Sequence, residues 1–247
     1  MELKALYEVK AVHKGNSHFY GADGQTYPGT TGYTGIIGGN KTRMLMGWAV
    51  KVALTSVRSW ALAFGAAPAL LEPDAVEAML KEAKAAPNKK KDDAADKGKL
   101  FHSYIEAFYK TGVKNPDPEF LECLEKLEFA LYEMGIKVIA TETPVVSKKY
   151  NVGGAIDAVG ERSGAIIILD WKFAGGIYEE YALQVGGSYV QCFRETYGVE
   201  PAAAVIFRYD LVGKFWEIKW VRDLNLALTT FLNCKDLKEN LNHKFYV

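Results

Sequence analysis

Apolar residues follow two different periods along this chain. Between residues 42 and 135 they recur at helical spacing in "TRMLMGWAVKVALTSVRSWALAFG", "DAVEAMLKEAKAA", "KLFHSYIEAFYKTG" and "PEFLECLEKLEFALYEMG". The last two of these helices are expected to end at Gly112 and Gly135. The polar segment "PNKKKDDAADKG" is expected to be a solvated loop that leads into a helix.

After Gly135 the period becomes that of strands. "IKVIATETPVVS", "YNVGGAIDAVGE" and "GAIIILDWK" follow one another through tight connections, which predicts an antiparallel meander. A helix is predicted over "YEEYALQVGGSYVQCFRETYG", two strands over "AAAVIFRYD" and "KFWEIKWVR", and a last helix that begins at Asp223. The alternating segments near the start predict a short hairpin that leads into a glycine-rich loop.

This order of elements predicts an α/β (α+β) fold, with a central mixed sheet flanked by helices and an N-terminal helical lobe. The chain has 247 residues, 49% of them hydrophobic, which is enough for a substantial core. We expect one domain over residues 1–247. Its parts are a hairpin and loop (1–39), a helical region (40–135), a sheet with one helix (136–222) and a C-terminal helix (223–247).

Charge and cysteine content exclude several classes of function. Lys plus Arg and Asp plus Glu both number 30, so any site for a polyanion must be local. No apolar leader or stretch of about 20 apolar residues is present, so we expect a cytoplasmic protein with no membrane partner. Cys123, Cys192 and Cys234 lie far apart and are too few for a four-cysteine iron–sulfur cluster, so we expect buried thiols.

The end of the apolar run "GAIIILDWK" carries an acid and a base. Because side chains alternate along a strand, Asp170 and Lys172 are expected on one face of the sheet and Trp171 on the other. Burial of a charge is costly unless the charge is paired or bound to a metal. The pair is therefore either a structural ion pair or part of a site that needs both groups.

A second acid stands thirteen residues earlier, in the preceding strand. A tight turn between the strands can bring Asp157 close to Asp170, and two adjacent carboxylates repel unless a cation lies between them. Oxygen ligands favour Mg²⁺ or Mn²⁺. Glu142, one strand further back, is either a third acid of this group or an exposed strand residue.

His102 and Glu106 are four residues apart and share one helix face. A lone histidine on a helix is usually structural. In the company of two aspartates and a lysine, however, it completes a set of groups suited to metal-assisted hydrolysis of a phosphodiester.

Four motifs in order resemble the PD-(D/E)XK nuclease superfamily. They are "GKLFHSYIE", "GGAID", "LDWK" and "YEEYALQVGGSY". They are similar to the histidine helix, the two acidic strands and the Gln/Tyr helix of the RecB-like, Cas4-like branch, which includes phage exonucleases and the mitochondrial genome maintenance exonuclease. The segment "YPGTTGYTGIIGG" is similar to the region before the catalytic core in phage members.

The resemblance implies a restriction-endonuclease-like sheet and a role for each matched residue. His102, Asp157, Asp170 and the carbonyl of Trp171 would hold the metal, and Lys172 would assist the nucleophile. Gln184 would touch the substrate or position Lys172. The possible further members of the site are Glu106, Glu142, Tyr181 and Tyr189.

The helix pattern departs from the family at one position. Ser188 stands where the family has a tyrosine, four residues after Gln184, and Tyr189 follows one place later. On an α-helix a five-residue step turns by about 140°, so Tyr189 is not expected to share the face of Gln184. Tyr181 is expected to share it.

By this resemblance the protein would be a metal-dependent deoxyribonuclease, an exonuclease that acts on DNA ends in recombination, replication or repair. Its partner would be DNA, single-stranded or at a duplex end, with a recombinase or replication protein as a possible second partner. Two alternatives stay open. One is an inactive nucleic-acid-binding module, and the other is an endonuclease of restriction or junction-resolving type.

Overall fold

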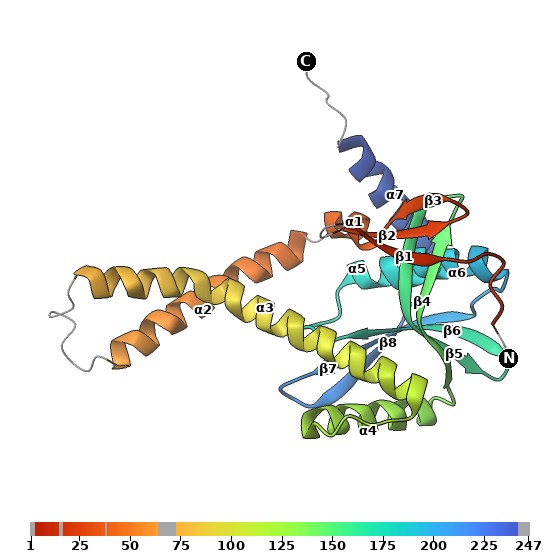
Figure 1. Cartoon of the computed structure of the whole chain (residues 1–247). Coiled ribbons are helices and arrows are strands. Elements are labelled where there is room, and N and C mark those ends of the chain that lie inside the picture. Colours follow the sequence, from red (N-terminus) through yellow and green to blue (C-terminus); the bar gives the residue numbers. More distant parts are fainter. Residues whose placement is uncertain (1–2, 15–16, 38, 64–72, 242–247) are drawn as a thin grey trace, which may run out of the picture. The chain divides into compact units, whose positions relative to one another are not determined.

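The computed structural model describes residues 3–14, 17–37, 39–63 and 73–241 (Figure 1). The chain divides into two compact units, residues 1–37 with 100–247 and residues 38–99. The single domain expected over the whole chain stays a prediction, and residues 242–247 of its C-terminal part lie outside the described residues. Among the described residues, no helix is long and apolar enough to cross a membrane.

The larger unit contains a five-stranded sheet in the order β4-β5-β6-β7-β8. Its strands are β4 (Lys137–Ser147), β5 (Val152–Arg162), β6 (Ala165–Lys172), β7 (Ala203–Asp210) and β8 (Phe215–Trp220). The pairing of β6 with β7 is parallel and the other pairings are antiparallel. The predicted meander and the predicted mixed sheet flanked by helices are confirmed, and the arrangement is consistent with a restriction-endonuclease-like fold.

Helices cover both faces of this sheet (Figure 1). On one face lie α5 (Glu179–Ala182), the π-helix η3 (Leu183–Tyr189), α6 (Val190–Tyr197) and α7 (Leu224–Leu241). The other face packs against α4 (Pro118–Glu133) and Phe101 and Ile105 near the end of α3. Because both faces are covered, β6 is apolar and buried from Ile166 to Leu169.

The N-terminal segment forms a three-stranded sheet of β1 (Lys10–Lys14), β2 (Ser17–Ala22) and β3 (Gln25–Pro28). The predicted hairpin is thus one strand longer, because Asp23 and Gly24 both adopt positive φ and turn the chain sharply into β3. The short helices α1 (Thr31–Thr34) and η1 (Gly35–Ile37) replace most of the expected glycine-rich loop, of which Gly38 lies outside the described residues.

The helical region consists of α2 (Gly39–Ala63) and α3 (Pro73–Thr111), followed by α4. The prediction of a solvated loop over "PNKKKDDAADKG" is wrong, because this segment is continuous helix. Lysine and alanine favour helix, and Asp96 forms an ion pair with Lys99 three residues later. Pro87 removes one backbone donor but does not end the helix.

Several predicted helix ends are confirmed. Gly112 and Gly135 have positive φ values of 72° and 64°, which place them in the left-handed region that glycine tolerates. The Oδ1 atom of Asp223 accepts a hydrogen bond of 2.9 Å from the amide of Leu226 at the start of α7.

We expect Gly187→Ala to lower the free energy of unfolding by about 1–3 kcal/mol, as overpacked cores do. A Cβ atom at this position in η3 would lie 2.6 Å from the backbone oxygen of Ala227 in α7. Gly35→Ala is the control, because its φ is −61° and a Cβ there meets no atom within 4 Å. Urea unfolding followed by tryptophan fluorescence compares them, and equal stability of the two variants would contradict this account.

Candidate metal and catalytic site

The end of β6 brings an acid and a base together, as its alternation predicts. The ammonium Nζ of Lys172 lies 2.8 Å from Oδ1 and 2.6 Å from Oδ2 of Asp170, whose side chain is 1% exposed. Trp171 points to the opposite face, where its ring packs against that of Phe207 at 5.1 Å. The buried strand therefore fixes the position of both charges.

The ladder between β5 and β6 stops before Asp170. The paired residues run from Arg162 and Ala165 to Ala158 and Leu169, and no pairing continues beyond them within the described strands. The amide of Trp171 instead donates a hydrogen bond of 2.7 Å to Oδ2 of Asp157. The carboxylate thus takes the place of a backbone acceptor where the two strands separate.

The regular alternation of β5 is interrupted at Asp157. Ile156 packs on one face of the sheet and Ala158 on the other, although residues two apart share a face in a regular strand. Glu142 lies between Thr141 and Thr143, which pair with Ala158 and Ile156, and its φ is +46°. Such a conformation costs a non-glycine residue about 1–3 kcal/mol and is common at functional sites.

Three side chains converge at this irregularity and could hold a metal ion. His102, Glu142 and Asp157 each offer one ligand atom, and these atoms lie within 4.8 Å of one another. Nδ1 of His102 is 3.7 Å from Oδ2 of Asp157. Two of these residues were expected as ligands. Glu142 was left open, and Asp170 lies outside this group of three.

Without a cation, the charged forms of these acids are unfavourable. Burial raises the pKa of Asp157, and burial and the nearby Asp157 raise that of Glu142 to about 7. Burial, together with the nearby Asp157, raises the pKa of Asp170 to about 6, although the ion pair of this carboxylate with Lys172 opposes the shift. A divalent cation would relieve the repulsion between these acids and favour their charged forms, so the residues present fit one.

His102 is suited to bind a metal as a neutral ligand. Burial, and next the charge of Lys172, lower its pKa to about 4. Its ring packs edge to face against that of Phe173, with the ring centroids 5.4 Å apart. At neutral pH the imidazole therefore keeps a lone pair for a cation.

Lys172 keeps its charge in this setting. Burial lowers its pKa, but Asp170 and Asp157 outweigh burial and the pKa is raised above its usual value. The ammonium lies 5.2 Å from the centre of the Tyr181 ring, so this expected member of the site also lies beside it. A fixed positive charge next to the acids can stabilise negative charge that develops on a phosphate.

Gln184 and Tyr189 lie together, contrary to the prediction from α-helical geometry. Nε2 of Gln184 donates a hydrogen bond of 2.5 Å to the phenolic oxygen of Tyr189. The segment Leu183–Tyr189 is a π-helix, in which residues five apart are hydrogen-bonded neighbours. The wider turn therefore brings together two side chains that are five residues apart, where an α-helix would bring together residues four apart.

Two further residues complete the description of the site. Glu106, one turn after His102, forms an ion pair with Lys110 and lies outside the group of three ligands. Arg208 was missed at the sequence level, although an arginine within the apolar run "AAAVIFRYD" was a signal of a buried charge. It is paired with Lys172 in the register of β6 and β7.

Comparisons with known proteins add little to this geometry. No family model matches the sequence, and no curated protein matches it. The crystal structure of SSO0001 is similar at 12% identity and a TM-score of 0.30, over 52% of this chain and 63% of that one. The crystal structure of an alkaline exonuclease (LHK-Exo) from Laribacter hongkongensis is similar at 12% identity and a TM-score of 0.30, over 58% of this chain and 84% of that one.

Proposed function

We propose that this protein is a metal-dependent deoxyribonuclease, an exonuclease that acts on DNA ends in recombination, replication or repair. The observation that carries the proposal is the convergence of His102, Asp157, Asp170 and Lys172 where strands β5 and β6 separate. A chance structural ion pair would explain Asp170 and Lys172 alone. It would not explain a second, half-buried acid, a neutral histidine and a strained Glu142 beside them.

Each residue has a role in this proposal. Asp157, Asp170 and His102, with the carbonyl of Trp171, would hold Mg²⁺ or Mn²⁺, and Glu142 would be an additional ligand. A bound cation would neutralise phosphate charge and lower the pKa of a water. Lys172 orients the nucleophile and balances negative charge on the scissile phosphate. Gln184, held by Tyr189, contacts the substrate or positions Lys172, and the ring of Tyr181 lies against the lysine ammonium.

The order of the motifs supports a place in the PD-(D/E)XK superfamily, in its RecB-like, Cas4-like branch. A histidine on a helix, acids on two adjacent strands and a glutamine on the following helix stand in the order that this resemblance requires. The nucleic-acid-binding module without turnover and the endonuclease remain as alternatives. DNA itself is the proposed partner, and a recombinase or replication protein would join it at DNA ends.

We expect linear DNA labelled at one end to be degraded in the presence of Mg²⁺ or Mn²⁺ and to stay intact with EDTA, because the ligand set consists of hard oxygens and one imidazole. Gel electrophoresis of single- and double-stranded substrates measures the products. Closed circular DNA is the matched control, since an exonuclease needs an end. Cleavage of the circle would indicate an endonuclease, binding without cleavage an inactive module, and cleavage after full chelation would refute the metal site.

A further inference from the structure

A groove lies beside the candidate site, on the same face of the sheet. It has a volume of about 460 Å³, within the range of pockets that bind small ligands. The segment before α5 and the strands β7 and β8 supply its walls. The residues that matter here are Ile177, Tyr178, Ile206, Lys219, Trp220 and Arg222.

The strand register connects this groove to the acids. Asp170 of β6 pairs with Ile206 of β7, which pairs with Lys219 of β8. Paired residues direct their side chains to the same face, so Lys219 stands on the face of Asp170, two strands away. At about 4.8 Å between strands this is roughly 10 Å, a distance that one or two nucleotides of a single strand can span.

Aromatic rings line the way from the site to the groove. The ammonium of Lys172 lies over the ring of Tyr181, and that ring contacts Tyr178 edge to face with centroids 5.6 Å apart. Tyr178 then forms part of the groove wall. Exposed and half-buried aromatic rings beside a phosphate-binding site are the surfaces on which unpaired bases stack.

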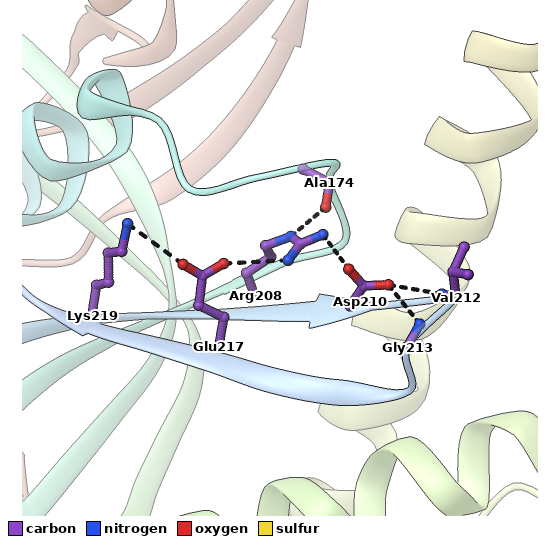
Figure 2. A network of polar contacts seen from close by, with 7 residues as sticks. All are labelled: Ala174, Arg208, Asp210, Val212, Gly213, Glu217 and Lys219. Atoms are coloured by element: carbon purple, nitrogen blue, oxygen red, sulfur yellow. Dashed lines mark hydrogen bonds and ion pairs between the residues drawn. The ribbon is translucent and has the colours of Figure 1, made fainter.

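A buried arginine fixes the walls of the groove (Figure 2). Nε of Arg208 donates a hydrogen bond of 2.7 Å to the carbonyl of Ala174, in the segment that leads to Tyr178. Its other nitrogens bind Asp210 at 2.7 Å and Glu217 at 3.2 Å. Glu217 also lies 3.5 Å from Lys219, so one network positions the segment after β6 and the lysine of β8.

The charges of the groove suit a phosphate chain. The side chain of Lys219 is 56% exposed, and Arg222 forms no ion pair with any residue that the structure describes. Glu179 also lines the groove, so one acid stands among these cations. Because the whole chain has no net charge, attraction of DNA depends on such local pairs of cations.

We propose that this groove binds single-stranded DNA next to the nucleotide that is cleaved. A base stacks on Tyr178, and the phosphates on either side of it contact Lys219 and Arg222. The inference rests on the proposed nuclease function, because it takes the acids of β5 and β6 as the point of cleavage. It adds the path of the bound DNA strand, which runs from the acids across β7 to β8.

Affinity for a fluorescein-labelled dT12 oligonucleotide, measured by fluorescence anisotropy in Ca²⁺, tests the groove. We expect Lys219→Ala/Arg222→Ala to weaken binding about tenfold and to reduce the slope of log affinity against log salt by about 1.4, since each phosphate contact on a single strand contributes about 0.7. Tyr178→Ala should weaken binding about fivefold or more through lost stacking. Arg222→Ala alone, which disturbs no ion pair among the described residues, should show half of the change in slope.

The matched control is Lys137→Ala/Arg162→Ala, which removes two exposed cations at the far end of β4 and β5. We expect it to bind dT12 within twofold of the unaltered protein. Thymidine 5′-(p-nitrophenyl phosphate), which reaches only the acids, should be hydrolysed in Mn²⁺ equally by the Lys219→Ala/Arg222→Ala variant and the control. If the groove variants weaken binding no more than the control does, the proposal that the groove binds DNA is wrong.

The experiments distinguish an error in the proposed groove from an error in the proposed nuclease function. If the unaltered protein cleaves DNA and the groove variants bind like the control, the groove is wrong and the function stands. If it binds dT12 without cleavage in Mg²⁺ or Mn²⁺, and the groove variants lose that binding, the groove stands and the nuclease function is wrong. No binding and no cleavage by the unaltered protein overturns both.

Discussion

Asp157→Asn is expected to reduce DNA cleavage by at least about 10³-fold, about 4 kcal/mol of barrier, while the fold remains intact. The amide removes the charge that would hold a cation beside His102 and Glu142. Its oxygen can still accept the hydrogen bond that Asp157 receives from the amide of Trp171. Because burial raises the pKa of Asp157, this position favours a neutral side chain, and the amide is not expected to destabilise the fold.

Asp157→Ala separates the chemistry from the structure. It should lose the same activity, but it should also lower the free energy of unfolding by about 1–3 kcal/mol, because the amide of Trp171 loses its acceptor. Glu125→Gln, at an exposed acid on α4, is the control and should change neither quantity. Single-turnover cleavage in Mg²⁺ and urea unfolding measure the two effects. An asparagine variant that keeps more than a few per cent of the rate would remove Asp157 from the site.

Lys172→Met is expected to reduce cleavage by about 10²-fold to 10⁴-fold, roughly 3–5 kcal/mol of barrier, with little change in metal affinity. An ammonium has no lone pair and cannot be a metal ligand, so the acids and His102 would still bind the cation. Methionine keeps most of the length that packs beside Tyr181. The loss should therefore appear in turnover and not in binding.

Three measurements on the Lys172→Met variant test this role. Calorimetric titration with Mn²⁺ and binding of dT12 in Ca²⁺ should be close to normal, whereas single-turnover cleavage in Mg²⁺ should collapse. Lys137→Met, at an exposed lysine of β4, is the control and should behave as the unaltered protein in all three. Normal cleavage by the Lys172 variant would leave Asp170 and Lys172 as a structural ion pair.

The pattern of the strands could be predicted from the sequence because it depends on local periodicity. The run from Ile166 to Leu169 is apolar because helices cover both faces of β6, and alternation then places Asp170 beside Lys172. The proximity of Asp157 followed from a tight turn between adjacent strands. The loop predicted for the segment that begins at Pro87 is wrong, because the helix propensity of alanine and lysine outweighs the effect of one proline and a run of charges.

Other parts of the site depend on backbone conformations that no period reveals. The positive φ of Glu142 and the interrupted alternation at Asp157 bring these acids together, and neither residue type favours such a conformation by itself. The hydrogen bond between Gln184 and Tyr189 was missed because the prediction assumed 100° for each residue of the helix. The buried Arg208 network depends on a strand pairing that only the three-dimensional structure defines.

The π-helix of residues 183–189 makes the spacing between two buried polar side chains tolerant of a change in chain length. Five residues separate Gln184 from Tyr189 here, and an α-helix would bring the same two side chains together across four. An insertion or deletion of one residue can therefore preserve their contact while it shifts every later position in an alignment. Comparisons that require a fixed interval between the two residues will fail to pair them in proteins that share the same arrangement in space.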